Sequence, residues 1–247
     1  MGGLRLALSL FTIAPVRADR VDRPAVRVAM LLAPLAGALL GLVLGVAAGG
    51  LVRLGAAPLL GGAVLVALSL LLTRGLHVDG LADTADGLGS YADAGKALEI
   101  MKKSDIGPFG VAAIAAVLLI DAAAATALLG RSFWAGAGAV CAAFAAGRLG
   151  ATVACRRGLS AARPSGLGAM VAATVPVWAL AAVTIVTAAL AALADPWRGP
   201  AAVLLAAGVS WGLTAHARRR LGGLTGDVIG AAVELSTAAA LITLATG

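Results

Sequence analysis

Seven long apolar segments recur along the chain, and they constrain its fold more than any other feature. They cover residues 29–52, 57–73, 108–129, 132–155, 170–194, 200–217 and 228–246. Each is near the length of about 20 residues that a helix needs to cross a bilayer. The mean hydropathy of +1.00 leaves little of the chain for a soluble domain. We therefore predict an all-α, polytopic membrane bundle, one domain over residues 1–247, with about seven transmembrane helices and short interfacial helices.

The lysines and arginines are distributed as the positive-inside rule requires. Fifteen of the 19 fall in four segments predicted to lie on one side of the membrane: residues 1–27, 74–107, 156–169 and 218–227. Only Arg53, Arg131 and Arg198 fall on the other side. This bias predicts an inner-membrane protein with a cytoplasmic N-terminus and an outside C-terminus. We attribute the net charge of +7 to this topology and to anionic lipids, not to nucleic acid.

Two further features near the N-terminus concern an interfacial helix and the packing of the first span. A short apolar stretch, Leu6 to Ala14, lies among five arginines and lacks a convincing cleavage site, which favours an interfacial helix over a signal peptide. Gly37, Gly41 and Gly45 follow at four-residue spacing in the first span. Such spacing lets helix backbones approach closely, so we predict a packing role for these glycines.

The stretch from His77 to Gly87 holds three carboxylates within eight residues, although only 13% of the chain is charged. Asp79, Asp83 and Asp86 are spaced i, i+4 and i+7, so a helix would place them on one face, about 10 Å from first to last. Carboxylates near apolar surroundings need a counter-charge. We predict that this face binds Mg²⁺ and, through it, phosphate oxygens.

A second acidic segment lies near the C-terminus. Asp227 and Glu234 would share one helix face, and the preceding glycines, Gly226 among them, would let a bulky ligand approach the backbone. Arg148 and Glu234 lie at similar predicted depths, and unpaired charges at that depth are costly, so we predict that they pair. A separation of more than about 6 Å between their side-chain ends, with no bridging group, would contradict this pairing.

Three further positions are open to more than one interpretation. The segment from Ser104 to Gly110 enters the third apolar span with Pro108 near its first turn, and its free amides could hold an anion or be capped in the ordinary way. Asp121 is predicted to be protonated and bonded to a backbone carbonyl, with no role in the reaction. His77 is either structural or in contact with the reacting groups.

These groups together predict a membrane transferase that acts on a diphosphate-containing donor. Magnesium commonly bridges a diphosphate to protein carboxylates and neutralises charge on the leaving group. A nearby cation would stabilise the phosphate oxygens, and the candidates are Arg148, Lys102 and Lys103. The residues alone do not specify the donor.

Three blocks of sequence resemble the cobalamin synthase family, the adenosylcobinamide-GDP ribazoletransferases. They are His77 to Gly87, Ile100 to Gly110, and Leu221 to Asp227 with Gly230, Ala231 and Glu234. The segments Leu10 to Val16 and Pro34 to Gly45 are also similar, so the resemblance covers nearly the whole chain. In the second block the family usually has an acidic residue before the serine and a basic one after it. Here Lys103 precedes Ser104 and Asp105 follows it, so neither position carries over.

The resemblance implies that α-ribazole or its 5'-phosphate attacks the cobinamide-linked phosphorus of adenosylcobinamide-GDP, releasing GMP and completing adenosylcobalamin or its phosphate. It also implies Mg²⁺ dependence and an integral membrane location. Transferred to this sequence, the ligands of Mg²⁺ are Asp79, Asp83, Asp86 and Asp227. One of these carboxylates, or His77, would accept the proton of the attacking hydroxyl. A homo-oligomer, or association with other cobalamin-assembly enzymes, is compatible with this function.

Rival functions fit the sequence less well. A CDP-alcohol phosphotransferase needs a further pair of aspartates with an Ala-Arg step after the first glycine, and residues 87–90 do not supply it. A prenyltransferase needs two Asp-rich motifs, and only one dense cluster is present. A transporter places its polar residues near the bilayer midplane in repeated halves, whereas these acids concentrate at one predicted membrane edge.

Overall fold

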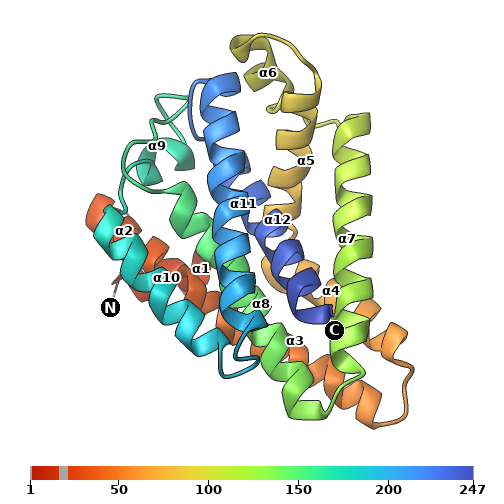
Figure 1. Cartoon of the computed structure of the whole chain (residues 1–247). Coiled ribbons are helices and arrows are strands. Elements are labelled where there is room, and N and C mark those ends of the chain that lie inside the picture. Colours follow the sequence, from red (N-terminus) through yellow and green to blue (C-terminus); the bar gives the residue numbers. More distant parts are fainter. Residues whose placement is uncertain (1, 17–21, 247) are drawn as a thin grey trace.

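The computed structural model describes residues 2–16 and 22–246, and within these ranges the chain is helical, with two isolated β-bridges and no strand (Figure 1). Five helices are long and apolar enough to cross a membrane. They are α3 (Ala33–Arg53), α7 (Pro108–Leu129), α8 (Phe133–Ala154), α11 (Arg198–Leu221) and α12 (Gly226–Ala245). These helices confirm the predicted polytopic membrane bundle.

The other two expected spans are short helices. Helix α4 (Pro58–Thr73) agrees with the predicted range 57–73, whereas α10 (Val177–Ala191) has only 15 residues in the predicted range 170–194. Residues 170–176, expected at the start of the span that α10 forms, instead include the end of α9 (Leu167–Val171) and a turn in which Ala173 adopts a φ of 57°. The described chain therefore has five candidate spans, or six when α4 is combined with the helix that follows it.

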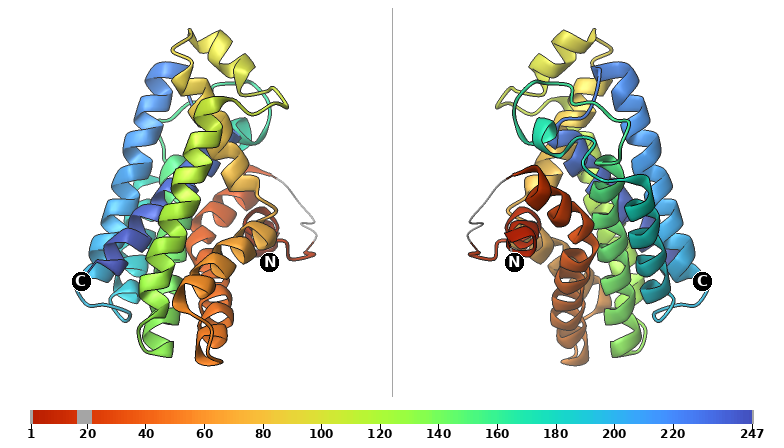
Figure 2. Two further views of the ribbon diagram at one scale, coloured as in Figure 1. Left: turned by 90° about the vertical axis from the view of Figure 1, so that its right-hand side faces the viewer. Right: turned by 90° about the vertical axis from the view of Figure 1, so that its left-hand side faces the viewer.

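The chain turns sharply between α4 and α5 (Leu76–Gly89). Arg74 and Gly75 both adopt left-handed backbone conformations, with φ values of 59° and 64°, and the two helix axes meet at 92°. Two consecutive left-handed residues end the hydrogen-bond ladder of α4, and the glycine carries no Cβ penalty there. The chain past Arg74 thus forms a separate helix, which runs toward the end of the molecule that holds α6 (Ala94–Ile100) (Figure 2).

The stretch from Leu6 to Ala14, predicted as an interfacial helix, is helical up to Phe11 as part of α1 (Gly2–Phe11), and a second short helix, α2 (Arg23–Leu31), leads to α3. Asp22 begins α2 by accepting a 2.9 Å hydrogen bond from the amide of Ala25. Arg17 and Arg20, counted among the N-terminal cations, lie outside the described residues.

Helix α8 lies at the centre of the bundle, packed against α3, α11 and α12. Its contact with α3 depends on the predicted glycines. A Cβ added at Gly41 would lie 2.8 Å from the Val140 carbonyl oxygen, and one at Gly45 would lie 2.8 Å from the Ala137 Cα. The packing role of these glycines is therefore confirmed, since larger residues could not occupy the same positions.

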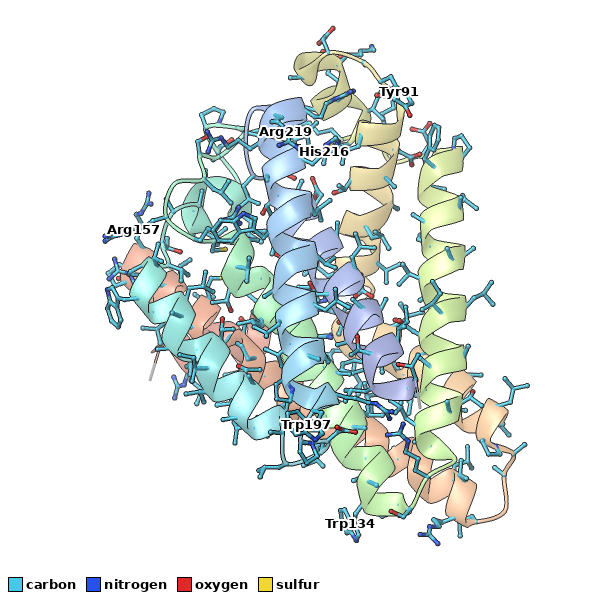
Figure 3. The ribbon with its side chains drawn as sticks, viewed as in Figure 1. Tyr91, Trp134, Arg157, Trp197, His216 and Arg219 are labelled. Carbon is cyan, nitrogen blue, oxygen red and sulfur yellow. The ribbon has the colours of Figure 1, made fainter. Side chains whose placement is uncertain are left out.

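The two ends of the bundle differ in charge and in aromatic content. The loops α3–α4, α7–α8 and α10–α11, which adjoin or contain Arg53, Arg131 and Arg198, lie toward one end (Figure 1). Trp134 and Trp197 lie toward the same end and are 72% and 87% exposed, as is typical of an aromatic belt (Figure 3). The end of α5, helix α6, the start of α7 and the end of α11 lie at the opposite end.

Candidate active site

Helix α5 packs directly against the first half of α12, and two glycines make this contact possible. A Cβ at Gly80 would lie 2.7 Å from the carbonyl oxygen of Asp227, and one at Gly230 would lie 3.0 Å from that of His77. The two backbones therefore touch, with no side chain between them. This approach brings the acidic stretch of α5 beside Asp227, two segments that are far apart in the sequence.

Asp79, Asp83 and Asp227 form an acidic group at this contact. Asp79 is exposed, whereas Asp83 and Asp227 are half-buried. Helix α5 has 14 residues and by itself is too short to be a spanning segment. Burial, and then the negative charges of Asp227, Asp79 and Asp86, raise the pKa of Asp83 to about 6. Mutual repulsion of this kind indicates a place where a cation would be stabilised.

Arg163 supplies a positive charge beside this acidic group, and no motif in the sequence indicates that it does so. It acts electrostatically on both Asp83 and Asp227. Its Nη2 donates a 2.6 Å hydrogen bond to the carbonyl of Leu98 in α6. The loop that carries it is fixed to the segment before α12, because the Leu224 amide donates to Ser160 at 2.8 Å and the Ala162 amide donates to Leu224 at 2.9 Å. In the sequence, Arg163 is distinguished only as one of three arginines in the segment 156–169, whose positive charge indicates the side of the membrane.

Asp86 lies apart from the acidic group in function. Its carboxylate accepts hydrogen bonds from the amides of Gly107 at 2.7 Å and Gly110 at 2.9 Å, and the side chain is buried. These are free amides at the start of α7, so Asp86 caps that helix from α5. The anion that the start of this span was expected to attract is therefore a carboxylate of the protein itself. Each of its oxygens accepts one hydrogen bond, so Asp86 has a structural role here, and its role as a metal ligand stays a prediction.

His77 is buried and does not belong to the acidic group. Its ring stacks on Phe11 with centroids 5.6 Å apart, and Nδ1 has no hydrogen-bond partner. Burial, and then the positive charge of Arg148, lower the pKa of His77 to about 3. The ring is therefore neutral near pH 7 and is a poor proton acceptor, which favours the structural interpretation.

Arg148 is also buried, with 1% of its surface exposed. Its Nη1 donates to Thr237 Oγ1 at 3.4 Å, and its guanidinium lies 4.8 Å from the centre of the Phe144 ring. Glu234 and Asp121 are the acidic groups whose charges act on it. Its hydrogen-bond partner is Thr237, but the charges of Arg148 and Glu234 act on each other, so the predicted pairing is an electrostatic interaction in which no direct bond is formed among the described residues. This depth is unsuited to the predicted contact with substrate phosphates.

The remaining predicted residues occupy different surroundings. Lys102 and Lys103 are exposed, and they follow α6 in the segment that leads to α7. Gly226 is the first residue of α12 and is half-buried. The Oδ1 atom of Asp121 has no hydrogen-bond partner, so the expected bond to a backbone carbonyl is absent at that atom.

The acidic group supplies oxygen ligands of the type that Mg²⁺ prefers. Within the described ranges, no three His, Cys, Asp or Glu side chains converge closely enough to enclose a metal ion. Magnesium, however, is commonly held by only one or two carboxylates, with waters and substrate phosphates completing its shell. Asp79, Asp83 and Asp227 fit this open arrangement, whereas they do not fit a closed cage.

Comparison with known proteins identifies the family. The family model described as cobalamin-5-phosphate synthase matches residues 3–245. The chain belongs to this family. A curated relative from Frankia casuarinae, named adenosylcobinamide-GDP ribazoletransferase, is 39% identical over 98% of this chain and 93% of its own. Proteins of the same name from Nocardioides sp. (41% identical, 96% of each chain) and Pseudomonas aeruginosa (38% identical, 98% and 97%) are also similar. No solved structure matches.

Membership in this family confirms the expectation of a transferase of cobalamin assembly. It also decides against the phosphotransferase, prenyltransferase and transporter alternatives. Because the match spans nearly the whole chain, it includes α5, the start of α12 and the loop that carries Arg163, which together build the site.

Proposed function

We propose that the protein joins α-ribazole, or its 5'-phosphate, to adenosylcobinamide-GDP. A ribose hydroxyl oxygen of the acceptor forms a bond to the cobinamide-linked phosphorus. The bond from that phosphorus to the bridging oxygen breaks, and GMP leaves with the electron pair. The observation that carries this proposal is the meeting of Asp79, Asp83 and Asp227 beside Arg163 at the contact of α5 with α12.

Asp79, Asp83 and Asp227 are the residues that we propose to hold magnesium at the donor diphosphate. Bound Mg²⁺ would supply positive charge that stabilises the leaving group as the phosphorus–oxygen bond breaks. Asp86 is not included in this proposal, because each of its oxygens already accepts a hydrogen bond from an amide at the start of α7.

Arg163 is the side chain that we propose to contact the phosphate oxygens, in place of Arg148. A guanidinium binds phosphate oxygens with two parallel donors, and this one is held by the Leu98 carbonyl while its charge acts on Asp83 and Asp227. The exposed Lys102 and Lys103 remain candidates for the same role.

The acceptor hydroxyl has to lose its proton, and a carboxylate is the better candidate for accepting it. With a pKa near 6, Asp83 is ionised at neutral pH and is closer to the pH of the reaction than His77, whose pKa is near 3. We assign this proton to one of the carboxylates of the acidic group and do not choose among them.

We further propose that this end of the bundle faces the cytoplasm and that the membrane is the inner membrane. Fifteen of the 19 lysines and arginines support this orientation. Nucleotide substrates are cytoplasmic, so the proposed site lies where its donor is available. An odd number of spans would place the C-terminus on the opposite side from the N-terminus, but the count of seven spans is no longer supported. The side on which the C-terminus lies therefore does not follow from counting spans.

The proposed function is tested by measuring GMP formation by the purified full-length protein in proteoliposomes, from adenosylcobinamide-GDP and either acceptor. GMP is expected only when donor, acceptor and Mg²⁺ are all present, and EDTA should abolish its release. Equal GMP release without an acceptor would indicate hydrolysis and would contradict the transfer reaction.

A further inference from the structure

A basic cavity lies between the segment after α8 and the last turns of α11. Its volume is about 390 Å³. Four arginines and a tryptophan dominate its lining: Arg156, Arg157, Arg218, Arg219 and Trp211. No acidic side chain of the described residues is among the lining groups. The cavity shares no residue with the acidic group of Asp79, Asp83 and Asp227.

One of these arginines, Arg156, is buried and held in place, whereas Arg157, Arg218 and Arg219 are exposed. Arg156 is 5% exposed, its Nη1 donates to Thr214 Oγ1 at 2.8 Å and to the Val153 carbonyl at 3.1 Å, and its guanidinium lies 3.7 Å from the centre of the Trp211 ring. Burial, and then the charge of Arg218, lower the pKa of Arg156. A buried cation that is repelled by its neighbours would be stabilised by an anion.

The shape of the cavity indicates what kind of anion it accepts. Trp211, Ala215, Arg218 and Arg219 are spaced i, i+4, i+7 and i+8, so they share one face of α11. The rise from Trp211 to Arg218 is about 10 Å along a helix that spans the membrane. Trp211 is 52% exposed. The cavity therefore begins among arginines at one end of the bundle and continues beside an aromatic ring at apolar depth.

We propose that this cavity binds one anionic phospholipid. Its headgroup phosphate would lie among Arg156, Arg157, Arg218 and Arg219, and the first part of an acyl chain would lie along Trp211. A soluble phosphate could use the same arginines but would leave the exposed Trp211 surface unused. Of the arginines that line this cavity, Arg157 lies at the edge of the bundle in Figure 3 and Arg219 lies at the end of α11.

The test is a lipid titration of the full-length protein in detergent, with bound lipids counted by native mass spectrometry. Phosphatidylglycerol should bind more tightly than phosphatidylcholine, and Arg218→Gln/Arg219→Gln should weaken its binding roughly thirtyfold, given the usual contribution of an arginine near an anionic headgroup. Arg220→Gln is the matched control. Arg220 follows these residues directly but lies over the Tyr91 ring, outside the cavity, so phosphatidylglycerol binding should not change.

Two outcomes would overturn the proposal. One is equal binding of phosphatidylglycerol by the wild type and the double variant. The other is release of the bound lipid from the wild type by millimolar inorganic phosphate, which would identify a soluble phosphate as the ligand. Because a variant could also be misfolded, the wild type is measured from 50 to 500 mM NaCl. Its phosphatidylglycerol binding should weaken with salt while phosphatidylcholine binding stays constant, and a constant ratio would also contradict the proposal.

Discussion

Asp83 is the residue at which protons and magnesium should compete. Because its pKa is raised to about 6, the carboxylate is ionised above that pH and protonated below it. At limiting Mg²⁺, GMP release should therefore fall about tenfold for each pH unit below 6. A tenfold increase in Mg²⁺ should move the midpoint to lower pH, since metal binding favours the ionised form. A midpoint that does not respond to Mg²⁺ would contradict a metal site at Asp83.

Asp86 should act on stability through the start of α7. Asp86→Ala would leave the amides of Gly107 and Gly110 without an acceptor, at a cost of about 1–3 kcal/mol each. We expect thermal unfolding in detergent at a clearly lower temperature than the wild type. Asp93→Ala, which removes an exposed cap from α6, is the control and should cost only about 1 kcal/mol. Equal shifts for the two variants would argue against this role.

The difference between Asp83 and Asp86 shows what the residue pattern could and could not predict. The i, i+4, i+7 spacing correctly indicated a helix with its carboxylates near one another. The roles of the members depend on contacts with residues 21 and 24 positions farther along the chain, which no local pattern contains. Arg163 was missed for the same reason, because its position is set by pairing of its loop with the segment before α12.

At the scale of elements, the contact of α5 with α12 should be intolerant of a single added methyl group. Gly80→Ala would place a Cβ 2.7 Å from the Asp227 carbonyl oxygen, so α5 would have to move away. We expect at least a tenfold loss of GMP release, because Asp83 and Asp227 would separate. Gly212→Ala on α11 is the control, since its Cβ would meet nothing within 4 Å. Equal activity of both variants would show that this close approach is not required.

Hydropathy predicted the long helices well, because apolar side chains continue along the whole length of each helix, whether they are buried or exposed. It failed where the backbone itself changes direction. The break after α4 depends on left-handed conformations at Arg74 and Gly75, and the shortening of α10 depends on a turn at Ala173. Apolar residues continue through the second of these sites, so composition gives no signal there.

For the whole molecule, the proposed orientation predicts which loops a membrane-impermeant thiol reagent can reach. Single cysteines at Ser104 and Ser132, in a variant without Cys141 and Cys155, lie at opposite ends of the bundle. In intact cells Ser132→Cys should be labelled and Ser104→Cys should not, and inverted vesicles should reverse this pattern. Labelling of Ser104→Cys in intact cells would contradict a cytoplasmic active site.

The central claim is that the carboxylates at the contact of α5 with α12 serve the chemical step. The most direct measurement compares GMP release by Asp83→Asn, Glu99→Gln and the wild type in proteoliposomes. Glu99 is an exposed carboxylate on α6, paired with Lys96 at 3.3 Å, and it tests the effect of losing a charge at the same end of the molecule. We predict that Asp83→Asn folds and inserts normally but releases GMP at least 100-fold more slowly, whereas Glu99→Gln behaves as the wild type. Wild-type turnover by a folded Asp83→Asn variant at limiting Mg²⁺ would contradict the proposed site.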